Sequence, residues 1–140
     1  MARRRTWGEQ PPSQPHVWNT LGYRHLSSGE GSSVVEWDAT EAYAFQDTTG
    51  PVVHGGLIST LLDTAMGGAC WTTLADDESF LTADLRVEFM RSARPGTLRA
   101  TGQVVRRTKR VAFCAAELFD EDGRLVAAGR CTQILRRDGT

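Results

Sequence analysis

Residues 54–75 read HGGLISTLLDTAMGGACWTTLA, and this stretch decides the fold. Its apolar residues recur at the three- and four-residue spacing of a helix; they are Leu57, Leu61, Leu62, Ala65, Met66 and Ala69. The opposite face carries only small or polar residues; they are Gly56, Ser59, Thr60, Asp63, Thr64 and Gly67. A helix with one side in water would carry lysine, arginine or glutamate there. The pattern predicts one long helix that begins at glycines and is covered on both faces.

Asp63 is the only formal charge in these 22 residues. Burying a carboxylate costs several kcal/mol unless it is hydrogen-bonded or neutralised. An acid kept in an enclosed position is therefore often functional. A surface aspartate, or one paired with an arginine, is the ordinary alternative, and the residues alone leave both interpretations open.

The segments on either side of this helix are typical of an antiparallel sheet. Ser33–Asp38 and Glu41–Gln46 are short and β-prone, and they predict an antiparallel pair. In Leu81–Arg91 the odd positions are apolar, which predicts a strand with one face on the core. Three further strands are expected at Thr97–Arg106, Val111–Phe119 and Arg124–Leu135. Residues 120–123 predict a hairpin turn, and His16–Leu26 a short helix or turn.

Two short strands, one long helix and four long antiparallel strands form an α+β pattern. A single helix covers only one face of a sheet, and Val111–Phe119 is apolar on both of its faces. We therefore expect a second copy of the chain to cover the other face.

Composition describes one globular domain, expected at residues 16–140 after a flexible tail at residues 1–15. The chain has 140 residues, of which 40% are hydrophobic and 24% charged, and a formal net charge of -1. This balance lacks the basic excess usual in nucleic-acid partners. The tail lacks the apolar run of a secretory signal, and no stretch reaches the roughly 18 apolar residues of a membrane span. These features predict a cytoplasmic protein without nucleic-acid or membrane partners.

The three cysteines Cys70, Cys114 and Cys131 have no CxxC spacing and no histidine cluster nearby. They are interpreted as buried free thiols of a reducing compartment. We expect no metal site and no cofactor.

The run Val53-His54-Gly55-Gly56, an acid nine positions after the histidine, and the strand FLTADLRVEFMRSARPG (residues 80–96) together carry a resemblance. The chain resembles the hotdog-fold acyl-CoA thioesterases of the phenylacetate-pathway (PaaI-like) group from about Leu21 to Leu135. Esterases of the α/β-hydrolase fold use a similar HGG loop, but they need a GxSxG elbow that this chain lacks. The resemblance implies a long central helix wrapped by a curved antiparallel sheet. It also implies a homodimer or homotetramer with active sites at the subunit interface.

The resemblance implies roles for five residues around the helix. The Gly55 N–H, at the positive end of the helix dipole, polarises the thioester carbonyl. Asp63 activates water or attacks directly, and the Thr82 hydroxyl orients this water from the neighbouring subunit. His54 either donates to the carbonyl or caps the start of the helix. Gly56 belongs to the substrate-binding candidates.

Two further groups are candidates for substrate binding. Many relatives have an Asn-Pro-x-Gly segment before HGG whose Asn contacts the thioester; here Asp47 and Thr48 stand near that position without a clean match. Four cations lie in a predicted turn, at Arg106, Arg107, Lys109 and Arg110. Such a run is usually a solvated turn, and nucleic-acid contact is another alternative. The resemblance favours contact with the phosphates of CoA.

The function expected from these observations is hydrolysis of aryl- or alkyl-CoA thioesters to free acid and CoA. The alternative is a non-catalytic hotdog module that binds acyl-CoA as a sensor or an assembly partner. A hotdog enoyl-CoA hydratase fits less well, because such enzymes place Asp and His four residues apart. Here six residues separate Asp47 from His54.

Overall fold

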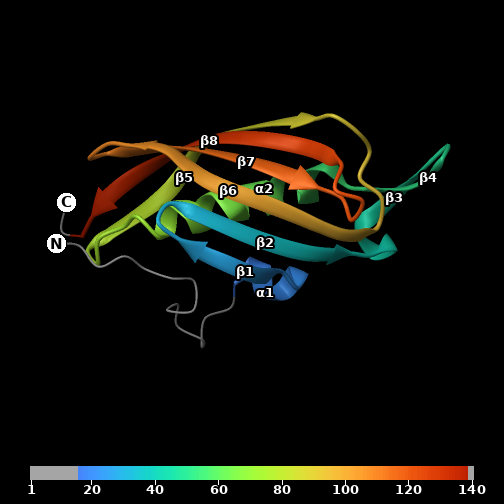
Figure 1. The fold of residues 1–140 in the computed structure, drawn as a ribbon, viewed down its shortest axis with the longest axis horizontal. Coiled ribbons are helices and arrows are strands. Elements are labelled where there is room, and N and C mark those ends of the chain that lie inside the picture. The colour runs from blue at the N-terminus through green and yellow to red at the C-terminus, as the bar shows by residue number, and fades with distance from the viewer. Residues whose placement is uncertain (1–15, 139–140) are drawn as a thin grey trace.

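The computed structural model describes residues 16–138 (Figure 1). The predicted flexible tail at residues 1–15 lies outside the described residues, as do residues 139–140. The elements are α1 (Val17–Leu21), β1 (Arg24–Gly29), β2 (Ser32–Ala39), a 3₁₀ turn (Glu41–Tyr43), β3 (Ala44–Asp47), β4 (Gly50–Val53), α2 (Gly55–Trp71), β5 (Glu78–Phe89), β6 (Gly96–Arg107), β7 (Val111–Phe119) and β8 (Leu125–Arg137).

The large sheet has six antiparallel strands in the order β1-β2-β6-β7-β8-β5, and β3 and β4 form a separate hairpin. The sheet curves along α2, which lies against one of its faces, and the β3–β4 hairpin extends beyond the body of the molecule (Figure 1). This is the predicted hotdog arrangement. The strand predicted at Val111–Phe119 is confirmed residue for residue, and Gly123 takes a φ of 78° in the predicted hairpin turn.

The pairing predicted for residues 33–46 is wrong. Strand β2 pairs with β1 and β6, and β3 pairs with β4 instead. Residues Glu41–Tyr43 form a 3₁₀ turn instead of a strand. Thr40 caps this turn, because its hydroxyl accepts a hydrogen bond from the Ala42 N–H. The β6 partner of β2 lies beyond α2 in the chain, so a local pattern could not reveal it. Strand β1 was not predicted at all.

The prediction that one alternation of apolar and polar residues runs through Leu81–Arg91 is also wrong. The register with β8 shifts between Thr82 and Asp84, which leaves Ala83 as a bulge. Thr82 opposes the buried Gln133 and so faces α2, whereas Leu81 is 65% exposed on the outer face. Beyond the bulge, the odd-numbered residues of β5 lie on the side that faces α2. The bulge therefore leaves the Thr82 hydroxyl on the side of β5 that faces the helix.

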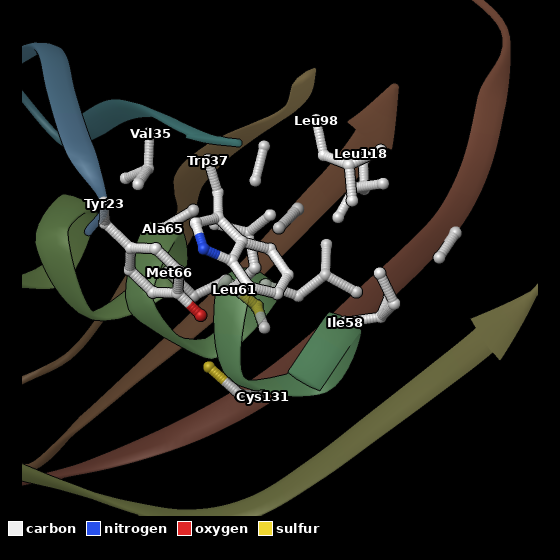
Figure 2. Packing of buried hydrophobic residues seen from close by; sticks show 14 of the residues in the cluster. Tyr23, Val35, Trp37, Ile58, Leu61, Ala65, Met66, Leu98, Leu118 and Cys131 are labelled. Carbon is white, nitrogen blue, oxygen red and sulfur yellow. The ribbon is translucent and has the colours of Figure 1, made fainter. Parts of the chain in front are cut away.

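The core lies between α2 and the inner face of the sheet. The predicted apolar face of α2 is buried there except for Leu57, which is only partly buried. Figure 2 shows the fully buried Trp37 indole at the centre of this cluster, with the ring of Tyr23 beside it. The centroids of the two rings are 5.6 Å apart. Helix and sheet approach closely at Gly102 of β6, where an added Cβ would lie 2.3 Å from the Ala65 carbonyl oxygen. Glycine at this position therefore lets the helix rest directly on the strand.

The three cysteines are buried and free of disulfides, as predicted. Within residues 16–138, no helix is both long and apolar enough to cross a membrane.

Candidate active site

The start of α2 is held by His54. The Gly56 N–H donates to His54 Nδ1 at 3.0 Å, and the N–H groups of Leu57 and Ile58 donate to the His54 carbonyl oxygen. His54 is therefore the N-cap of the helix, one of the two roles considered for it. Because Nδ1 accepts this bond, the neutral imidazole carries its proton on Nε2.

The Gly55 N–H differs from its neighbour, because no acceptor in the described part of the chain receives it. It belongs to the first turn of α2, where unpaired N–H groups and the helix dipole favour negative charge. The Phe89 ring lies close to Gly55, since an added Cβ would be 3.3 Å from Phe89 Cζ. A free amide at this position can stabilise an oxyanion.

Asp63 lies in the third turn of α2 and is half-buried. The Thr82 hydroxyl donates to Asp63 Oδ1 at 3.0 Å. Among residues 16–138, no cation lies within ion-pair distance of this carboxylate. Burial raises the pKa of Asp63, and the bond from Thr82 offsets the rise only in part.

Thr82 contacts Asp63 within one chain, whereas the resemblance implied a hydroxyl from the neighbouring subunit. The bulge at Ala83 explains this geometry, because it keeps Thr82 on the helix side of β5. The two residues that sequence reasoning placed around one water are thus adjacent in the same protomer.

Gln133 of β8 is the polar residue that sequence reasoning missed. Its side chain is 0% exposed, and its Oε1 lies 3.0 Å from Thr82 Oγ1. Its Nε2 donates to Cys131 Sγ at 3.3 Å. The available signal was its place in the inward-facing row of β8, where the other alternate residues are small or apolar; they are Ala127, Gly129, Cys131 and Leu135.

Gly55 and Asp63 are not brought together within one chain. Asp63 lies eight positions after Gly55 in the α-helix, which corresponds to a rise of about 12 Å. An oxyanion donor and a base acting on one carbonyl group must each lie about 3 Å from the reacting atoms. A single protomer therefore holds two separate halves of the expected site.

Asp47 and Thr48 are exposed at the far end of the β3–β4 hairpin. Asp47 lies three register pairs beyond Val53, a distance of about 10 Å along the strand. Arg94 holds this hairpin by donating to the Pro51 carbonyl oxygen and the Thr49 hydroxyl. Within the protomer neither candidate reaches Gly55.

The four predicted cations divide into two groups. Arg107 donates to the buried Glu78 carboxylate and to the Thr73 carbonyl oxygen, just beyond the end of α2. The side chains of Arg106, Lys109 and Arg110 are exposed and form no ion pair with another described residue. All four lie at the C-terminal end of α2, opposite Gly55.

A hollow of about 380 Å³ lies beside Gly55 at the start of α2. Its walls are mainly apolar and include Phe45, Val52, Ile58, Phe89 and Met90. In residues 16–138, no three His, Cys, Asp or Glu side chains gather where they could hold a metal ion.

Comparison with known proteins gives one consistent family. The family model of the Thioesterase superfamily matches residues 50–127. The medium/long-chain acyl-CoA thioesterase YigI of Salmonella typhimurium is 31% identical in an alignment of 97 residues, and the match covers 60% of this chain and 63% of that protein. The chain thus matches less than two thirds of the length of this relative.

Solved structures agree with the family match. A phenylacetic acid degradation-related protein of Ralstonia eutropha JMP134 is 32% identical, with 91% of this chain and 93% of that chain covered and a TM-score of 0.79. A thioesterase family protein of Silicibacter pomeroyi is 25% identical, with 89% and 90% covered and a TM-score of 0.79. Because the family model covers more than half of the chain, this protein belongs to the Thioesterase superfamily.

Proposed function

We propose that this protein hydrolyses acyl-CoA thioesters to free acid and CoA, as a member of the PaaI-like group. The observation that carries the proposal is the half-buried Asp63, which has a hydroxyl partner but no cation in the described residues. An acid without a cation keeps a basic oxygen, because burial disfavours its charged form. Asp63 acts as general base on water, or as nucleophile.

In the general-base route, Asp63 takes a proton from water as the water oxygen attacks the carbonyl carbon. The carbonyl oxygen becomes an oxyanion, which the Gly55 N–H stabilises. The C–S bond then breaks, and the CoA sulfur leaves as a thiol after receiving the proton from Asp63. The chemistry requires no redox change.

The site is completed by two copies of the chain. The helical rise of about 12 Å between Gly55 and Asp63 prevents one copy from supplying both groups to one carbonyl. Strand β5 is an edge of the sheet, is twelve residues long and exposes Leu81, Leu85 and Phe89. Such an edge is a template for pairing with another strand. We infer a dimer in which Gly55 of one copy faces Asp63 and Thr82 of the other.

The outer face of the sheet offers a second contact between copies. Phe113 and Ile134 are exposed on it, on β7 and β8. Two dimers joined through this face would form a homotetramer. Light scattering tests the assembly: we expect at least twice the 15.4 kDa of one chain, and a monomer at micromolar concentration would contradict the shared site.

The substrate divides between the two ends of the site. Arg106, Lys109 and Arg110 are free to meet the phosphates of CoA, and the apolar hollow beside Gly55 suits an acyl group. The relatives point to two acyl classes, since YigI is a medium/long-chain acyl-CoA thioesterase and the Ralstonia protein is related to phenylacetic acid degradation. We propose that medium-chain or aryl groups occupy the hollow.

A thiol-release assay with a panel of aryl- and alkyl-CoA thioesters tests the function. We expect turnover that ranks the acyl groups. The alternative is an acyl-CoA-binding module, and the distance of Asp47 and Thr48 from Gly55 favours it, because the second carbonyl contact of many relatives is then missing. Saturable binding of acyl-CoA without thiol release would select this alternative.

A further inference from the structure

Gln133 is a fully buried amide whose side-chain hydrogen bonds, among the described residues, go to a hydroxyl and a thiol. An amide costs free energy to bury unless its hydrogen bonds are satisfied, whereas a methionine or leucine would fill the same volume without that cost. The hydroxyl it meets is that of Thr82, which is also bound to Asp63.

We propose that Gln133 is a positioning residue of the active site, whose amide sets the direction of the Thr82 hydroxyl and so decides which of Thr82 and Asp63 donates the bond between them. This inference rests on the proposed catalytic role of Asp63. It assigns to a buried residue of β8 a function in the reaction, although Gln133 itself does not touch the substrate.

The Thr82 hydroxyl has a single proton to donate. Thr82 Oγ1 lies 3.0 Å from Asp63 Oδ1 and 3.0 Å from Gln133 Oε1, and both are oxygens that can accept. One hydroxyl proton can be donated to only one of them. When it is donated to Gln133, the contact with Asp63 is a hydrogen bond only if Asp63 is protonated and donates to Thr82.

A rotation of the Gln133 amide by 180° gives the other complete arrangement. Its Nε2–H then donates to Thr82 Oγ1, and the hydroxyl donates to an ionised Asp63. The Cys131 S–H can donate to the amide oxygen, which now faces it. The two amide orientations therefore match the two protonation states through which a general base passes, and every contact in each joins one donor to one acceptor.

No other charged group among the described residues controls the bond between Thr82 and Asp63. The titratable groups of β7 and β8 whose pKa is raised by the charge of Asp63 are the Cys114 and Cys131 thiols. The bond with Cys114, together with burial, raises the pKa of Cys131. The bond with Cys131 lowers the pKa of Cys114, but its bond to Cys70 and burial outweigh this and raise it to about 12. Both thiols are neutral at pH 7, so the Thr82–Gln133 pair is the polar network that faces the acid.

A kinetic double-mutant cycle tests the inference, using the full chain and the best thioester of the panel. Gln133→Met keeps the length of the side chain and removes its hydrogen bonds. We expect kcat to fall about tenfold, within the range of couplings in one hydrogen-bond network, with KM changed less than about twofold. In the Thr82→Val background, Gln133→Met should have no further effect. Equal factors in both backgrounds would show a role in core stability alone and overturn the inference.

Thr72→Val is the matched control, because it also removes a buried polar group. The Thr72 hydroxyl donates to the Ala69 carbonyl oxygen at 2.8 Å and accepts from the Gly31 N–H at 2.7 Å. Its loss should lower the melting temperature but leave kcat of the folded protein unchanged.

Gln133→Glu provides a second test, which also serves if Gln133→Met does not fold. The introduced acid, while protonated, has one donor and one acceptor like the amide. Once ionised it can only accept, so it accepts the hydrogen bond from the Thr82 hydroxyl and adds negative charge beside Asp63. We expect the ratio of variant to wild-type kcat to fall as pH rises, and a constant ratio would contradict the inference. A wild-type protein that releases no thiol overturns the proposed function, whereas an active wild type with an unaffected Gln133→Met variant overturns this inference alone.

Discussion

Asp63 and Glu78 are two acids that the fold shields from water, one partly and one almost fully. They differ in their partners, since only Glu78 has a cation beside it among the described residues. Glu78 is bound by Arg107 and accepts a bond from the Ala75 N–H at 2.8 Å. Asp63 has the Thr82 hydroxyl and no described cation. Burial raises the pKa of both acids. At Glu78 the hydrogen bonds and the arginine charges outweigh it, so its pKa is lowered, whereas the pKa of Asp63 remains raised.

We propose that this difference separates a structural acid, Glu78, from a catalytic one, Asp63. The Glu78–Arg107 pair joins the start of β5 to the end of β6 and, through Thr73, to the end of α2. It stabilises the fold where three elements meet. Asp63 is half-buried without such compensation, so its charge costs stability at neutral pH. The general-base role proposed for Asp63 would account for an acid kept at this cost.

Asp63→Asn should give the largest effect and tests the reactive half of this comparison. We expect kcat in thiol release to fall by about 10²–10⁴-fold, the usual value of general acid–base assistance. Thermal unfolding should show unchanged or higher stability, because the variant removes an uncompensated charge. A variant that keeps more than about a tenth of wild-type kcat would remove Asp63 from the mechanism.

Glu78→Gln tests the structural half. We expect a loss of about 2 kcal/mol in the free energy of unfolding, less than the ~3–5 kcal/mol of a fully enclosed pair, because water reaches part of Arg107. Urea titration measures this loss, and kcat and KM should stay at wild-type values. A large fall in kcat without loss of stability would mean that the two acids are not functionally distinct.

Acid titration should separate the two acids in one sample. The raised pKa of Asp63 places the loss of kcat above the ordinary aspartate pKa of about 3.9, because the base must be ionised. The lowered pKa of Glu78 means that its stabilisation is present above its unfolded pKa and is lost only as pH falls through the lower folded value. Activity should therefore disappear at a pH where thermal unfolding still reports a stable fold. Coincident loss of both would contradict the distinction.

Substituting the exposed cations should give the smallest effect of these predictions. Arg106→Ala combined with Arg110→Ala should raise KM for CoA thioesters severalfold with kcat unchanged, because a phosphate contact is similar in ground and transition states. The effect should shrink as salt rises. Arg107→Ala is the contrast, since it should lower stability like Glu78→Gln. A KM increase that is equal for a pantetheine thioester, which has no such phosphates, would rule out phosphate binding.

Much of the fold could be predicted because its signals are local. The apolar spacing of residues 57–69 describes α2, and the Asp120–Gly123 turn describes the β7–β8 hairpin. The role of Gly102 and the strand β1 could not be predicted. Both depend on partners far away in the chain, namely the Ala65 carbonyl and the strand β2.

The candidate site divides in the same way. Asp63 could be singled out because a single acid stands out on a helix without other charges, whereas the role of Gly55 was implied by the family resemblance, as the first glycine after His54. Gln133 was missed, since one glutamine in a strand is unremarkable until its neighbours are known. The separation of Arg107 from the other three cations was equally invisible, because it depends on Glu78, 29 residues earlier.

By itself the sequence determined the long helix, the acid in its middle, the hairpin between β7 and β8 and the α+β class of the fold. These follow from periodicity and from residue chemistry over a few turns or strands. Only the tertiary structure decided that the bulge at Ala83 directs Thr82 at Asp63, that Gln133 lies behind Thr82, and that Arg107 is bound by Glu78. The physical reason is that a strand's register and the partner of a buried polar group are set by segments distant in the chain, whose pairing leaves no local pattern.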